Sequence, residues 1–193
     1  MLSQEEILNM FLESGALLEG HFLLTSGRHS NRYMQCARVL QYPRYAEKLG
    51  AALAEGFKDA GVEAVIGPAM GGIIVAHEVG RALRTRAFFT EREQGVMTLR
   101  RGFTLEPGTR VLVCEDVVTT GGSVREVMEV VREKGAQVVG VGVLVDRSGG
   151  KVDFGVPLRA LLTMEIPSYD AAECPLCREG LPLVKPGSRQ ING

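Results

Sequence analysis

Short apolar runs alternate with longer segments in which apolar residues recur at helical spacing. The runs near 64–66, 87–90, 110–115, 138–145 and 158–164 are predicted strands. Helical spacing follows several of them, for example at Val124, Val127 and Val131. This alternation predicts an α/β fold with a mostly parallel central sheet and helices on both faces.

The N-terminal part has a different pattern. Ser3 and Glu6 form a capping box that predicts a short helix through about Ser14, ended by Gly15. From 20 to 35, turn residues interrupt short apolar pairs, which indicates a hairpin or an irregular hood. We expect one domain over 1–193, with a small N-terminal hood at 1–40 and a C-terminal tail at 168–193.

Charge and composition exclude several classes of function. The net charge is −1, so no broad basic face indicates a nucleic-acid partner. No signal segment and no apolar run of membrane-spanning length is present, so we expect a cytoplasmic protein without a membrane partner. Isolated cysteines at Cys36 and Cys114 favour a reducing compartment.

The most informative segment is 111–123, in which an apolar strand leads into Glu115, Asp116 and a hydroxyl-rich turn. The acids fall at the carboxyl end of a buried strand, where open α/β sheets bind ligands. The turn at 119–123 lies over the first turn of a helix, whose free N–H groups attract phosphate. An ordinary βα loop capped by threonine or serine is the alternative, but it needs only one hydroxyl.

A second glycine-rich turn, at 67–72, also follows a strand and opens a helix. It leaves the backbone N–H groups of Met70, Gly71 and Gly72 free for an anion. Taken alone, this strand-to-helix turn is equally well explained by close packing of the strand against the helix, which is the alternative to anion binding. Two anion sites at neighbouring strand ends suit a substrate that is phosphorylated at both ends of a ribose.

In this order, residues 111–123 resemble the phosphoribosyl diphosphate (PRPP) signature of the type I phosphoribosyltransferases. The resemblance implies that Glu115 and Asp116 bind the ribose hydroxyls and that 119–123 wraps the 5-phosphate. It makes 67–72 the diphosphate loop. It also implies that the connection at 91–103, too long and too charged for a tight turn, is a lid that brings arginines to the leaving diphosphate. A solvated hairpin is the alternative for this connection.

Two further segments resemble the orotate enzymes of that family. Residues 21–33 contain the F-x-L-x-S-G-x-x-S pattern that lies over the base, and Arg147 follows a predicted strand at the place of the arginine that meets the orotate carboxylate. A guanidinium suits this task because it pairs a carboxylate with two hydrogen bonds. A surface ion pair with Asp146 or a neighbouring residue is the alternative for Arg147. Three positions depart from the common pattern: Thr25 and Gly71 replace lysines, and arginines replace K-x-x-K-x-H in the lid.

The chain therefore resembles the orotate phosphoribosyltransferases, which are pentosyltransferases of pyrimidine biosynthesis. The resemblance implies Mg²⁺ held mainly by substrate oxygens, orotate and PRPP as substrates, and a homodimer with shared active sites. The expected catalytic residues are Asp116, Glu115 and Arg100. The expected substrate-binding residues are Val117, Val118, Thr119, Thr120, Gly121, Gly122, Ser123, Arg147, Ala69, Met70, Gly71, Arg92, Arg101, Ser26 and Tyr33. A purine-base transferase and a PRPP-sensing regulator of the same fold are the alternatives.

Cys174 and Cys177 have metal-ligand spacing near the C-terminus, but a structural zinc site needs four ligands. We find no second pair in the sequence, and His21, His29 and His77 are too scattered to predict a metal cluster. We therefore expect no bound metal other than the substrate's magnesium. A zinc site shared by two subunits and a redox pair remain alternatives to a plain exposed turn.

Overall fold

A computed structural model of the chain describes residues 2–24 and 26–186. A six-stranded sheet forms its centre, with the strand order β5-β4-β3-β6-β7-β8. Neighbouring strands run parallel except for β5, which is antiparallel to β4. The strands are β3 (Ala64–Pro68), β4 (Arg86–Glu93), β5 (Val96–Leu99), β6 (Arg110–Val118), β7 (Gln137–Asp146) and β8 (Leu158–Thr163). The predicted α/β fold is confirmed.

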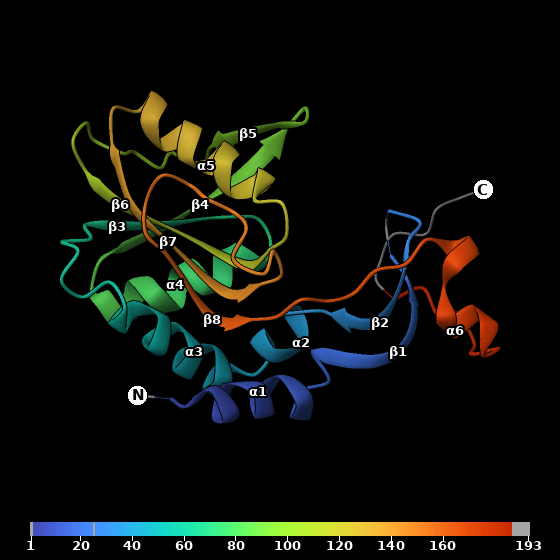
Figure 1. The fold of residues 1–193 in the computed structure, drawn as a ribbon. Helices are drawn as coiled ribbons and strands as arrows, with labels where there is room; N and C mark the ends of the chain where they lie inside the picture. The colour runs from blue at the N-terminus through green and yellow to red at the C-terminus, as the bar shows by residue number, and fades with distance from the viewer. Residues whose placement is uncertain (1, 25, 187–193) are drawn as a thin grey trace.

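Helices cover both faces of the sheet (Figure 1). On one side lie α1 (Gln4–Glu13), α3 (Pro43–Glu55) and α4 (Gly71–Leu83), and on the other lies α5 (Gly122–Glu133). Alternate residues of β6 serve the two layers, since Leu112 packs with the first group and Val111 and Val113 with the second. Burial on both faces explains the continuous apolar runs of the sequence. None of the helices in 2–24 and 26–186 is long and apolar enough to cross a membrane.

The predicted hood is a separate two-stranded antiparallel sheet of β1 (Leu17–Leu23) and β2 (His29–Met34). It projects from the body of the molecule beside the C-terminal segment (Figure 1). The predicted capping box at Ser3 and Glu6 is present, and the first helix ends at Glu13 as expected. Short helices complete the structure: α2 (Ala37–Leu40), the 3₁₀ turn η1 (Ala171–Glu173) and α6 (Pro175–Arg178).

The segment 91–103 differs from the prediction of a long connecting loop. Glu91 to Glu93 extend β4, and β5 returns antiparallel to it after a turn at Gln94 and Gly95. Both turn residues have positive φ, 50° and 87°, which is the geometry of a tight two-residue hairpin. The hairpin given as the alternative is therefore the form that this connection takes, although glutamine is not the residue usually found at the first position of such a turn.

Candidate active site

The two acids lie together near the end of β6, at the carboxyl edge of the sheet. The strand continues through Val118, two residues beyond Asp116. The Glu115 carboxylate accepts a hydrogen bond from the Asp116 N–H at 3.0 Å, and the Asp116 carboxylate accepts one from the Val117 N–H at 2.9 Å. Burial, followed by the charge of Asp116, raises the pKa of Glu115 to about 9. Burial also raises the pKa of Asp116. The pair therefore carries less than two negative charges near neutral pH.

The hydroxyl-rich turn leads directly into α5, whose N-cap is Gly121. Gly121 has φ 78°, which favours glycine because a Cβ is strained there. No side chain caps this helix, so the alternative of an ordinary threonine or serine cap is wrong. The first N–H groups of α5 and the hydroxyls of the turn face a cleft of about 240 Å³. Its lining is Arg92, Glu115, Val117, Val118, Thr119, Thr120, Gly121, Gly122, Ser123, Val124 and Glu126. Such a helix end suits a phosphate group.

Arg125 supports the turn from beneath, a role that sequence reasoning missed. Its guanidinium donates to the backbone oxygens of Thr120 at 2.8 Å and Asp153 at 2.9 Å. It also stacks over the Phe154 ring, 5.0 Å from the ring centroid. An arginine in the first turn of a helix is not recognisable as a loop support until the loop after β7 is placed beside it.

The second glycine turn joins β3 to α4 and lies beside the acids because β3 and β6 are neighbours in the sheet. Gly71 approaches closely enough that a Cβ there would overlap the Asp116 carboxylate. Met70 is 82 % exposed and caps α4 without a side-chain hydrogen bond. The Ala69 N–H donates to the Thr90 carbonyl at 2.7 Å. The two predicted anion-binding turns are therefore brought together.

Arg147 follows β7 on the same edge of the sheet. Its backbone N–H donates to the Val118 carbonyl at 2.8 Å, and its Nε is buried without a hydrogen-bond partner among the described residues. Burial lowers the pKa of this guanidinium, while Cys36 and Tyr33 raise it. A buried donor without a partner costs free energy that a bound anion would recover.

The ion pair between Asp146 and Arg147, which is the alternative interpretation of this arginine, does not form. Asp146 is 2 % exposed and accepts instead from the N–H groups of Ser148 at 2.7 Å and Gly150 at 3.1 Å. It orders the loop that carries Arg147, and the Arg147 Nε is left without a hydrogen-bond partner among residues 2–24 and 26–186.

Comparison with known proteins was consistent with this geometry. The phosphoribosyl transferase domain matches residues 37–154. The orotate phosphoribosyltransferase of Desulforamulus reducens is 62 % identical over 190 residues, covering 98 % of this chain and all of that protein. The Thermotoga maritima orotate phosphoribosyltransferase is 58 % identical over 179 residues, covering 93 % and 96 % of the two chains. The chain belongs to the orotate phosphoribosyltransferase family.

Solved structures agree with this assignment. The orotate phosphoribosyltransferase of Aeropyrum pernix is 31 % identical, with a TM-score of 0.66 over 82 % of this chain and 93 % of its own. An adenine phosphoribosyltransferase from Rhodothermus marinus, 22 % identical with a TM-score of 0.58 over 69 % of this chain and 87 % of its own, shares the fold. The resemblance to the orotate phosphoribosyltransferases predicted from the sequence is confirmed.

The three arginines of segment 91–103 all form ion pairs in this member of the orotate phosphoribosyltransferase family. Arg92 lines the cleft beside the hydroxyl-rich turn and pairs with Glu126 at 2.7 Å. Arg100 pairs with Glu93 at 3.1 Å, and Arg101 pairs with Glu91 at 2.8 Å. Only Arg92 of the three is part of the cleft lining. Exposed ion pairs of this kind are weak, so a multiply charged anion could compete for any of these guanidinium groups.

The N-terminal stretch that resembles the orotate enzymes forms the hood hairpin. Ser26 is exposed in the turn between β1 and β2, and its hydroxyl accepts from the Arg28 N–H at 3.4 Å. Ser30, in the same pattern, is fully buried and donates to the Pro167 carbonyl at 2.7 Å. Ser30 therefore attaches the hairpin to the segment after β8. Thr25, which replaces a family lysine, lies outside the described residues.

Two of the three histidines lie together with the C-terminal cysteine pair. His21 and His29 are 4 % and 5 % exposed and lie against Cys174 and Cys177, so the prediction that they are too scattered to join a metal cluster is wrong. The cysteine pair is not a plain exposed turn, because Cys174 is only 1 % exposed. The matching domain at 37–154 contains none of these four residues.

Proposed function

We propose that this protein transfers the 5-phosphoribosyl group of PRPP to orotate, giving orotidine 5-monophosphate and diphosphate. The observation that carries the proposal is the meeting of three groups at one edge of the sheet: the acid pair, the start of α5 without a side-chain cap, and the Arg147 Nε, which has no hydrogen-bond partner among the described residues. Each suits one part of the two substrates: ribose hydroxyls, 5-phosphate and the orotate carboxylate. A purine base has no carboxylate for Arg147.

The proposed reaction requires stabilisation of charge and positioning of the ribose, and it needs no nucleophile from the protein. Substitution at an anomeric carbon passes through an oxocarbenium-like state. In our proposal the Glu115 and Asp116 oxygens bind the ribose hydroxyls and hold the ring in place, and the negative charge that the pair carries stabilises the cationic ring. The 119–123 turn fixes the phosphate end, and the 67–72 turn receives the diphosphate.

We propose Mg²⁺ as the cofactor, which would neutralise the diphosphate as it leaves. Magnesium prefers oxygen ligands and keeps several waters, so substrate oxygens would supply most of its ligands. The residues present fit this arrangement, since the buried carboxylates of Glu115 and Asp116 lie beside the 67–72 turn and gain from a nearby cation.

The proposed reaction is tested by the loss of orotate absorbance when PRPP and Mg²⁺ are added together. Adenine, hypoxanthine and uracil serve as competing bases, and omission of PRPP is the control. Turnover that depends on orotate and is insensitive to the other bases supports the proposal. Consumption of PRPP with a purine, and none with orotate, would contradict it.

We also propose a homodimer in which the β4–β5 hairpin of one subunit serves the site of the other. Exposed apolar side chains support a partner surface: Met70 and Ile74, 82 % and 41 % exposed, lie one turn apart at the start of α4. The four free cysteines fit a reducing compartment, and we propose the cytoplasm as the place of action.

Subunit mixing tests the shared site. One inactive protein carries Asp116→Asn, and the other carries Arg100→Ala with Arg101→Ala. Random exchange in a two-fold dimer gives about half heterodimers, and one site in each would receive both intact halves, so activity should return to about a quarter of wild type. No recovery, with heterodimers confirmed by differently tagged subunits, would refute sharing. It would leave the proposed reaction itself untouched.

A further inference from the structure

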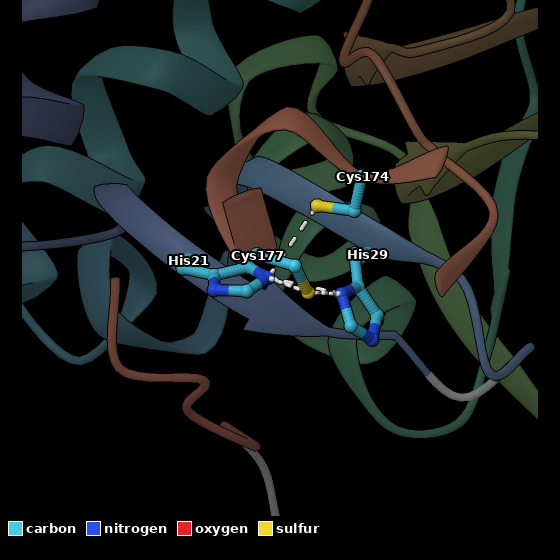
Figure 2. A group of neighbouring side chains, drawn as sticks. All are labelled: His21, His29, Cys174 and Cys177. Atoms are coloured by element: carbon cyan, nitrogen blue, oxygen red, sulfur yellow. Dashed lines mark hydrogen bonds between the residues drawn. The ribbon is translucent and has the colours of Figure 1, made fainter. Parts of the chain in front are cut away.

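Four potential metal ligands from opposite ends of the chain converge beside the hood hairpin. His21 lies on β1 and His29 begins β2, while Cys174 and Cys177 flank the start of α6 (Figure 2). Their ligand atoms all lie within 4.8 Å of one another. None of the four belongs to the proposed active site.

Four of the separations are close to those of a tetrahedral zinc site. With Zn–S of about 2.3 Å and Zn–N of about 2.05 Å, tetrahedral angles give about 3.6 Å between sulfur and nitrogen and about 3.3 Å between two nitrogens. In the structure, His21 Nε2 lies 3.5 Å from Cys174 Sγ and 3.7 Å from Cys177 Sγ. Cys177 Sγ lies 3.3 Å from His29 Nδ1, and the two ring nitrogens are 2.9 Å apart. Small shifts of the two rings would admit the ion.

The hydrogen bonding of His21 prepares its Nε2 to act as a ligand. Its Nδ1 lies 2.8 Å from the Leu181 carbonyl oxygen, which can only accept, so Nδ1 carries the proton. In neutral imidazole the lone pair is then on Nε2, which faces the cluster. A backbone carbonyl in this position is the usual outer partner of a metal-binding histidine.

We propose that His21, His29, Cys174 and Cys177 form a structural zinc site. Two thiolates and two imidazoles are a donor set that selects zinc over magnesium or calcium. Binding releases one proton from each thiol, so the two thiolates balance the charge of the ion. Four protein ligands leave no open position for catalysis, which makes the site structural.

The site would fasten the C-terminal segment to the hood. A two-stranded sheet is marginally stable by itself, and β1–β2 is not part of the six-stranded sheet. Backbone bonds already attach the segment at two points: His29 pairs with Tyr169, and the Val184 N–H donates to the His21 carbonyl at 2.8 Å. A zinc ion between these points would connect residues about 150 positions apart in sequence. It would hold the hairpin that carries Ser26 and Tyr33. The inference does not depend on the proposed reaction.

The first test is metal content and affinity. Reduced wild-type protein incubated with equimolar ZnCl₂ and desalted should hold about one zinc per chain by elemental analysis. Cys177→Ser is the main variant, because Cys177 is exposed and its replacement disturbs packing least. Loss of an outer partner alone weakens binding about 10- to 100-fold, so loss of a ligand should weaken it at least about 100-fold in competition with a chromophoric chelator. His77→Gln, at the exposed third histidine, is the matched control and should keep wild-type affinity.

Spectroscopy and thiol chemistry provide tests that need no variant. Cobalt substituted for zinc should give the intense visible bands of a four-coordinate sulfur–nitrogen site. Because Cys177 is exposed, a thiol reagent should modify it rapidly in stripped protein and slowly once zinc is restored. Any one of three results would overturn the proposal: less than about 0.1 zinc per folded chain, a zinc affinity of Cys177→Ser equal to that of the wild type, or a rate of thiol modification that is the same with and without zinc. A Cys174–Cys177 disulfide that persists in mild reductant would do so too.

Discussion

Glu115→Gln should change how stability depends on pH. Burial and the charge of Asp116 raise the pKa of Glu115 from an ordinary 4.5 to about 9 in the folded protein. Between these two values the folded state keeps a proton on Glu115 that the unfolded state releases. The free energy of unfolding therefore falls as pH rises through this window, and the contribution of Glu115 is most favourable below about pH 4.5.

The size of the effect follows from the linkage relation. One proton bound only in the folded state gives a slope of about 1.4 kcal/mol per pH unit. From about pH 6 to about pH 8 the free energy of unfolding of the wild type should fall by about 2–3 kcal/mol because of Glu115. Glutamine does not titrate, so the variant lacks this decrease. The difference in unfolding free energy, variant minus wild type, should increase by that amount over the same range.

Urea unfolding at about pH 6, 7 and 8, without substrates or divalent metal, provides the measurement. Glu106→Gln, at an exposed glutamate, is the control and should follow the wild type at each pH. If Glu115→Gln and wild type show parallel pH dependences, Glu115 is ionised in the folded protein at neutral pH and the argument from burial is refuted.

Three other substitutions test the roles proposed for the site. Asp116→Asn should bind PRPP but lower turnover roughly 10²-fold or more, the scale for removing a preorganised charge; near-normal kcat would exclude it from the mechanism. Arg147→Ala should raise the orotate KM about 30-fold or more, because two charge-assisted hydrogen bonds to orotate are lost. The affinity for PRPP, measured without orotate, should be unchanged. Equal losses for both substrates would indicate damage to the fold. Gly71→Ala should lower kcat/KM at least about 10-fold at nearly unchanged Tm, because the added Cβ displaces the Asp116 carboxylate. Gly56→Ala is the control and should leave kcat/KM unchanged, because a Cβ there meets only ordinary contacts. Equal activity of the two variants would refute the close approach of Gly71 to Asp116.

The sequence determined the features that depend on local order. Apolar runs that alternate with helical spacing predicted the parallel sheet, and the positions of Glu115 and Asp116 after an apolar run placed the acids at its carboxyl edge. The capping box of α1 and the glycine at the start of α5 also follow from neighbours in sequence. These features involve residues a few positions apart, so short-range sterics and hydrogen bonding settle them.

The tertiary structure decided what depends on residues distant in sequence. The overlap between a Cβ at Gly71 and Asp116 exists only because β3 and β6 pair. Within the part of the chain that the structure describes, Asp146 accepts from its own loop, and the Arg147 Nε is buried without a partner. The cluster of His21, His29, Cys174 and Cys177 brings together distant parts of the chain. Cys174 and Cys177 have metal-ligand spacing, but His21 lies about 150 positions away from them in sequence. Packing of distant elements sets these contacts, and neither composition nor periodicity encodes which distant segments will meet.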